Sequence, residues 1–306
     1  MSAIIEAALP VFAIILVGFL CGQRKLLGEQ SSEAINRFVY LVALPVMLFH
    51  VLATADPKEV LNGPYILAYG GVQAVLFAGM WIGTRWLGRQ DSPTSSVFAL
   101  GSMFGNTGYV GIPLATVAFG TVGTQAAIVA TVFQSAIFLP LTAVMIDASR
   151  NTGGQKRVIV KTVLTNPILL ASVAGVAWSF TGIDLAVPID TFGRLLAGAA
   201  GPSALFALGL VLSGIRVRSM GPLPWVNVGV KLFVHPALTA IAVFLLIPVQ
   251  SDWAVVAILM SALPAGANLF VIARQSGAGV EMASAATLIG TIASVATVSA
   301  LLAFFA

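Results

Sequence analysis

The segment SMFGNTGYVGIP, residues 102–113, lies inside a long apolar run and breaks it with three glycines, a proline and an asparagine. A second segment, ALPAGANLF at residues 262–270, interrupts another apolar run in the same way. Glycine lets the backbone leave the helical conformation, and proline removes an amide donor and presses on the preceding turn. One such segment would fit ordinary helix packing with a proline kink. Two of them raise the question of whether the runs correspond to each other.

The composition places these runs in a bilayer. Of the 306 residues, 58% are apolar and 8% are charged, whereas soluble domains carry about a quarter charged residues. A helix needs roughly 20 apolar residues to cross the hydrocarbon core. Runs of that size fall at 3–23, 34–54, 64–87, 95–119, 123–146, 162–181, 191–213, 222–247, 252–274 and 280–305. We therefore predict an all-α, multi-pass protein of the cell inner (plasma) membrane with about ten spanning helices.

The distribution of basic residues predicts the orientation of the chain. If the loop after the first run is inside, the outside loops hold Lys58, and Arg194 lies near an outside helix start. The inside loops then hold Arg24, Lys25, Arg85, Arg89, Arg150, Lys156, Arg157, Lys161, Arg216, Arg218 and Arg274. Because basic residues favour the cytoplasmic side, both termini are expected outside. The same reasoning assigns the positive net charge to topology, and nucleic acid is not expected as a partner.

A polar stretch around residues 148–161 divides the chain into a first half, 1–147, and a second half, 162–306, of five runs each. An odd number of crossings inserts the second half upside down, so the halves would form an inverted repeat. At an offset of 157 residues the matched pairs include Pro10 with Pro167, Gly18 with Gly175, Pro45 with Pro202, and Phe49 with Phe206. Identity elsewhere is at the level of chance, so the prediction depends on this pattern.

The two interrupted segments fall in the fourth run of each half, which predicts two broken helices that cross near the membrane midplane. Free amides at the start of a half-helix attract anions. Asn106 and Asn268 add neutral side-chain donors. Gln134 on the fifth run is a candidate for the wall of the same cavity. The candidate substrate-binding residues on the two segments are Asn106, Thr107, Gly108, Tyr109, Pro264, Gly266 and Asn268.

Ionisable residues inside the runs are few, and the deep parts hold no Asp or Glu. Lys231 and His235 lie one turn apart in the eighth run, and Glu6 lies near the outer end of the first. A charge or proton role is a candidate function for all three. For Lys231 the alternatives are a neutral amine, attraction of an anion, or extension of its side chain to the interface.

Other functional classes lack the residues that they need. A membrane-embedded enzyme requires paired carboxylates, a Ser–His couple or His/Glu metal spacing, and a channel requires a filter or a ring of charge. We therefore predict neither catalysis, nor a metal, nor a cofactor. A sensor would not need paired helix breaks. A sodium-coupled symporter of organic anions stays an alternative, because Ser, Thr, Asn and backbone oxygens can also bind sodium.

The motif GNTGYVGIPL, residues 105–114, resembles the signature of the auxin efflux carrier family. The resemblance continues in INRFV at residues 35–39, in Pro45 and Phe49, and again in ALP at residues 262–264. It implies ten helices in two inverted bundles, with helices four and nine crossing beside the substrate, as in NhaA and the bile-acid symporters. It also implies that Asn106 contacts the substrate, and that helices one, two, six and seven form a scaffold beside a moving transport domain. Plant members have a proline where this chain has Gly105.

The resemblance brings Pro45 and Phe49 into the candidate substrate site and implies a substrate similar to auxin or malonate. The expected function is therefore secondary transport of a small organic anion by elevator-type alternating access, in the direction of efflux. The expected partners are the substrate and the lipid bilayer. A homodimer, the coupling ion and the identity of the anion stay open.

Overall fold

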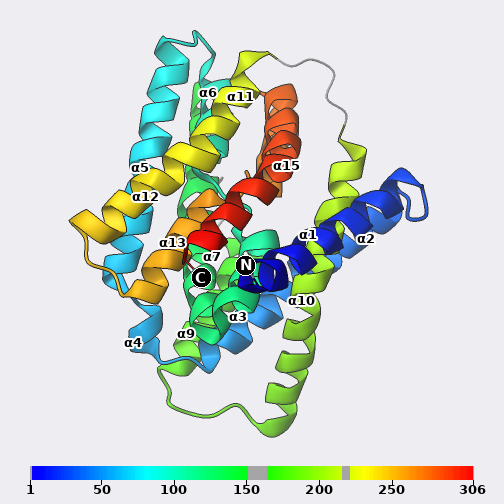
Figure 1. Ribbon diagram of the computed structural model, residues 1–306, viewed down its shortest axis with the longest axis vertical. Helices are drawn as coiled ribbons and strands as arrows, with labels where there is room; N and C mark the ends of the chain where they lie inside the picture. Colours follow the sequence, from blue (N-terminus) through cyan, green and yellow to red (C-terminus); the bar gives the residue numbers. More distant parts are fainter. Residues whose placement is uncertain (1, 151–163, 216–220, 306) are drawn as a thin grey trace.

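The computed structural model describes residues 2–150, 164–215 and 221–305, with the backbone alone for residues 2–7 and 59. Over these ranges the chain is helical, with one isolated β-bridge between residues 105 and 265 (Figure 1). The elements are α1 (Ser2–Gln23), α2 (Glu29–Phe38), η1 (Val39–Ala43), α3 (Leu44–Ala53), α4 (Pro57–Val60), α5 (Gly63–Trp86), α6 (Ser92–Met103), η2 (Thr107–Gly111), α7 (Ile112–Ser149), α9 (Pro167–Ser179), α10 (Val187–Gly214), α11 (Pro222–Gly229), η3 (Val230–Val234), α12 (His235–Ile241), η4 (Ala242–Leu246), α13 (Ser251–Ala262), α14 (Ala267–Ser276) and α15 (Val280–Phe305), where η marks a π-helical turn.

Length and apolar composition make this a polytopic membrane protein. In the described ranges, six helical segments are long and apolar enough to cross a bilayer: Glu29–Ala53, Gly63–Trp86, Thr107–Ser149, Val187–Gly214, Pro222–Leu246 and Val280–Phe305. Shorter apolar helices cover Ala8–Gln23, Pro167–Ser179 and Ser251–Ala262. The all-helical membrane fold predicted from the sequence is confirmed. Most of the predicted linker, from residue 151 on, lies outside the described residues.

The helix α7 joins two of the predicted runs but reverses direction inside its length. Gly120 has φ 58° and ψ −141°, a conformation in which a side chain would be strained. The hydroxyls of Thr116 and Thr124 meet across the reversal at 2.8 Å. The two arms of α7, before and after Gly120, are therefore antiparallel neighbours. The boundary predicted between the runs 95–119 and 123–146 is this sharp turn.

Each of the π-helical turns in the described chain ends two residues before a proline. These prolines are Pro45, Pro113, Pro236 and Pro248. A proline ring clashes with the carbonyl one turn earlier and provides no amide. The residue before the proline donates to the carbonyl five positions back, as Leu44 does to Val39 and Ile112 does to Thr107. After η1, η2 and η3 the wider turn accommodates the ring and the helix continues, whereas after η4 the helix ends at Leu246.

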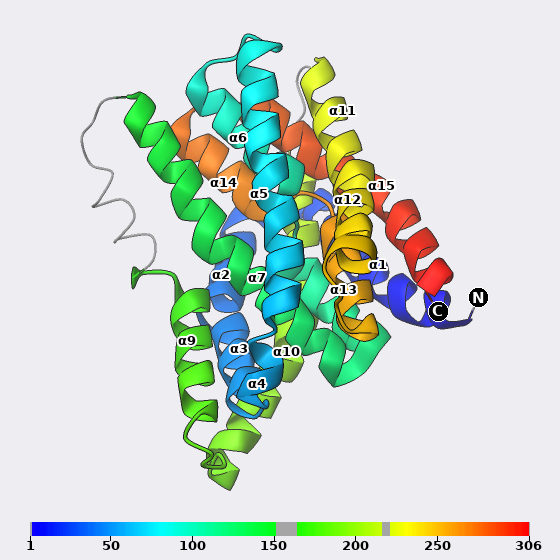
Figure 2. The ribbon, with the colours of Figure 1, turned by 90° about the vertical axis from the view of Figure 1, so that its left-hand side faces the viewer.

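The helices form two neighbouring groups. Figure 1 shows α1, α2 and α10 on one side and α5, α12 and α13 on the other. Figure 2 shows α3 and α9 side by side. These two helices contact each other and α7, and α3 also contacts α10. The start of α1 and the end of α15 lie close together in both views. We call α1–α3, α9 and α10, with η1, the first group, and the remaining helices the second group.

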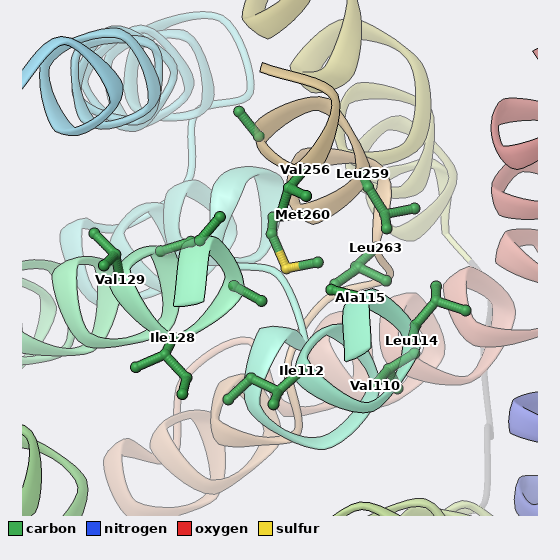
Figure 3. Packing of buried hydrophobic residues seen from close by; sticks show 14 of the residues in the cluster. Val110, Ile112, Leu114, Ala115, Ile128, Val129, Val256, Leu259, Met260 and Leu263 are labelled. Atoms are coloured by element: carbon green, nitrogen blue, oxygen red, sulfur yellow. The ribbon is translucent and has the colours of Figure 1, made fainter. Parts of the chain in front are cut away.

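Small residues let the helices approach at the centre of the second group. Figure 3 shows Met260 and Leu263 between the helix α13 and the start of α7, where Val110, Ile112 and Ala115 lie. A Cβ at Gly111 would lie 2.7 Å from atoms of both Met260 and Leu263. Glycine is therefore required for this approach, which holds the two interrupted segments together.

Candidate functional site

Two interrupted helices cross at the candidate site. The helix α6 ends at Met103 and α13 ends at Ala262, and the residue after each is extended. Gly105 and Ala265 then pair as an antiparallel β-bridge. The Asn106 amide donates to the Pro264 carbonyl at 2.8 Å, and the Gly266 amide donates to the Phe104 carbonyl at 3.0 Å. Each break thus satisfies backbone groups that the other leaves unpaired inside the membrane body. The interruptions predicted at both segments are present.

Glycine is needed at the crossing because two backbones lie in contact. A Cβ at Gly105 would lie 2.9 Å from the Met260 carbonyl oxygen and 3.4 Å from Nζ of Lys231. A Cβ at Gly266 would lie 2.9 Å from the Phe104 ring. Any larger residue at either position would push the two chains apart.

The starts of two helices lie at the crossing. One helix begins at Thr107, continues through η2 into α7, and has Asn106 before its first residue. The other is α14, which begins at Ala267 after Gly266. Neither start is capped by a side chain. The first amides of both helices therefore offer partial positive charge to whatever occupies the crossing.

A small pocket with both polar and apolar walls opens at this point. It encloses about 20 Å³ of free volume, which is enough for about one water molecule. Its wall consists of Tyr40, Leu44, Phe104, Gly105, Asn106, Thr107, Gly108, Tyr109, Thr131, Gln134, Ser135, Ile168, Gly266, Ala267 and Asn268. A ligand much larger than a water molecule would need the walls to separate.

Asn106 differs from the other pocket residues in its hydrogen bonding. Its side chain is 4% exposed, and within the described chain its Nδ2 has no hydrogen-bond partner. An unpaired buried amide donor costs on the order of 1–3 kcal/mol. A ligand that accepts a hydrogen bond in this pocket would recover that cost.

Gln134 stabilises the interrupted segment from behind. Its Nε2 donates to the Gly105 carbonyl at 2.8 Å and to Oγ1 of Thr107 at 2.7 Å. Gln73 donates to Oε1 of Gln134 at 3.3 Å. This chain of amides satisfies the carbonyl that the helix break leaves without a helical partner and fixes Thr107 in the pocket wall.

The pocket gathers seven of the residues predicted from the sequence and leaves others elsewhere. It holds Asn106, Thr107, Gly108, Tyr109, Gln134, Gly266 and Asn268. Pro264 lies beside the crossing and contributes its carbonyl to it. Pro45 and Phe49 instead line a separate apolar cavity of about 270 Å³. The side chain of Glu6 lies outside the described part of the structure.

Several pocket residues had no signal in the sequence. Tyr40, Leu44 and Ile168 come from the first group of helices, and Thr131 comes from the second arm of α7. Their positions depend on how the two groups pack, which local sequence does not determine. Because both groups line the pocket, it lies at the boundary between them.

Lys231 and His235 are buried on the other side of the crossing. Lys231 is 1% exposed and donates to the carbonyl of Ser261, in the last turn of α13. Its Nζ lies 3.3 Å from Nδ1 of His235. Extension of the Lys231 side chain to the membrane interface, one of the alternatives above, is therefore wrong. A neutral amine and attraction of an anion stay open.

His50 has a partner that sequence reasoning missed. Its Nε2 lies 2.8 Å from Oδ1 of Asp190, and Arg194 contacts the other carboxylate oxygen at 3.0 Å. Gly193 packs on the His50 ring. The cluster joins α3 to α10, so its role is to fasten two helices of the first group.

A helical membrane body with two broken helices around a buried polar pocket is the architecture of a class of membrane transporters. Comparison with known families agrees with that class. The chain belongs to the family described as membrane transport protein, whose model matches residues 3–302, and its relatives include auxin efflux carriers. This is a family of transporters, which removes the membrane-embedded enzyme from the alternatives.

Individual relatives cover nearly the whole chain. A "Putative malonate transporter" of Rhizobium meliloti is 30% identical over 99% of this chain and 96% of its own length. An "Uncharacterized transporter" of Methanothermobacter thermautotrophicus is 26% identical over 94% of each chain. "Auxin efflux carrier component 5" of Arabidopsis thaliana is 24% identical over 95% of this chain and 93% of its own.

Proposed function

We propose that this chain transports a small organic anion whose carboxylate binds at the crossing. The observation that carries the proposal is the buried, unpaired Nδ2 of Asn106, which lies in a pocket wall beside two uncapped helix starts. These groups are all hydrogen-bond donors or positive dipole ends, which complement a carboxylate. Asn268 adds a second neutral amide. The name of the Rhizobium relative supports a small dicarboxylate such as malonate.

We further propose that the two halves are inverted repeats, in which the first helix of each half packs against the second helix of the other half. In the first group, Gly18 of α1 packs on the Phe206 carbonyl of α10, and Gly175 of α9 packs on the Phe49 carbonyl of α3. Gly18 and Gly175 are 157 residues apart, as are Phe49 and Phe206. The two contacts therefore repeat each other at the offset found in the sequence. This repetition supports the division into residues 1–147 and 162–306.

The movement proposed for transport is an elevator. The first group is the scaffold, and the second group, which contains the crossing, is the domain that moves. Two features support this division: the pocket lies between the groups, and it is too small for a ligand much larger than a water molecule until they separate. Efflux is the proposed direction, with both termini outside the inner membrane.

Substitutions of Asn106 test the proposed site. In purified protein, Asn106→Ala should weaken malonate binding about tenfold to a hundredfold, because a hydrogen bond to a charged group contributes about 1.5–3 kcal/mol. Asn106→Asp should weaken it further, because it adds a negative charge to the pocket. Asn62→Asp is the matched control, since Asn62 does not line the pocket and caps α5 by accepting from the Tyr65 amide, which Asp can also do. Titration calorimetry measures all four proteins, and malonate binding by Asn106→Asp at the affinity of the control would refute the site.

A further inference from the structure

The buried amine of Lys231 has no anionic partner among the residues that the structure describes. Among the described side chains, the ion pairs join Arg37 with Glu33, His50 with Asp190, and Arg194 with Asp190. No described carboxylate lies within ion-pair distance of Lys231. Charge inside a membrane body is expensive, and it is usually paired or functional. The pocket described above makes no use of this residue.

The backbone at Gly105 separates Lys231 from the pocket. A Cβ at Gly105 would lie 3.4 Å from Nζ of Lys231, and Gly105 forms part of the pocket wall. On its other side the amine donates to Ser261, at the carbonyl end of α13. Lys231 is thus placed behind the wall, where it can act on the pocket by charge without touching its contents.

The two sides of the crossing differ in the donor that they use, an amide on one side and an ionisable amine on the other. On one side Gln134, a neutral amide, donates to the Gly105 carbonyl at the break after α6. On the other side Lys231 donates to the last turn of α13. Both satisfy carbonyls near the carbonyl end of a half-helix, where a positive group is favoured. A neutral amide suffices for that purpose at Gln134, so an ionisable amine at Lys231 calls for a further role.

We infer that Lys231 carries a positive charge when substrate is bound and is a specificity-determining residue that favours more negatively charged substrates by acting through the crossing, an inference that rests on the proposed function. A fixed positive charge behind the wall attracts a dianion more than a monoanion of the same shape, because the Coulomb energy scales with ligand charge. The backbone at Gly105, and not solvent, lies between the amine and the pocket, and the attraction between charges is stronger where water does not separate them. Lys231 is accordingly a positioning residue for charge and makes no contact with the ligand.

The test compares two ligands of matched shape. Malonate carries two carboxylates, and in malonamate an amide replaces one of them. The wild-type chain should prefer malonate, and in Lys231→Met that preference should fall about tenfold. Lys231→Gln separates charge from hydrogen bonding, because it keeps a donor for Ser261 and should lose the same preference. Leu232→Met is the matched control, since Leu232 is buried in the same turn and carries no charge.

The outcomes are distinguishable. If the role of Lys231 is purely structural, Lys231→Met will weaken the binding of both ligands equally. That result would overturn the inference and leave the proposed function in place. An unchanged preference in a folded Lys231→Gln protein would overturn it as well. If the wild-type chain binds neither ligand, the proposed function fails and this inference fails with it. Size-exclusion profiles establish that each variant is folded.

Discussion

Gly105 is the residue at which backbone geometry, the pocket and the buried amine meet. It pairs with Ala265, lines the pocket, and leaves no room for a Cβ in front of Met260. The amino-acid identity at this position therefore determines how closely the two broken helices approach. Its neighbour Asn106 then places an amide in the pocket whose Nδ2 has no partner in the described chain.

Gly105→Ala should destabilise the protein by about 1–3 kcal/mol, because an added methyl in a packed interior forces the surrounding backbone to move. Gly79→Ala is the control, since Gly79 lies within a helix and a Cβ there would meet nothing within 4 Å. That change should be neutral or stabilising, because alanine favours the helix. Thermal unfolding in detergent measures both proteins. Equal melting temperatures for the two variants would contradict the close approach at the crossing.

At the scale of elements, local sequence predicts breaks well and partners poorly. The interruptions near Gly105 and Pro264 were predictable because glycine and proline act within one turn of their own position. The Gly120 reversal was predictable as a boundary for the same reason. In contrast, the bond of Lys231 to Ser261 and the bond of His50 to Asp190 span 30 and 140 residues. They depend on helix packing angles, which the sequence does not display.

The matched contacts of α1 with α10 and of α9 with α3 yield a prediction about helix packing. Gly18→Leu and Gly175→Leu should each destabilise the first group and to a similar extent, because each side chain would collide with the equivalent carbonyl. Gly71→Leu is the control, since Gly71 is exposed on α5 and a Cβ there has open space. Thermal unfolding compares the three variants. A large loss in one of the first two and none in the other would contradict the repeat.

At the scale of the whole molecule, composition predicted the membrane fold, and the paired breaks predicted where the pocket lies. Seven pocket residues were found in this way because they lie on, or face, the interrupted segments. Tyr40, Leu44 and Ile168 were not, because they reach the pocket from the other group of helices. Pro45 and Phe49 were expected beside the substrate but line a different cavity.

The most direct test of the account is malonate counterflow into liposomes that contain the purified protein. Labelled external malonate should accumulate against unlabelled internal malonate, with saturation and with competition by other small carboxylates. The Asn62→Asp protein should accumulate it as the wild type does, and the Asn106→Asp protein should not. The account would be contradicted if the wild type accumulates none of a panel of small carboxylates, if it carries a cation instead, or if Asn106→Asp transports malonate at the wild-type rate.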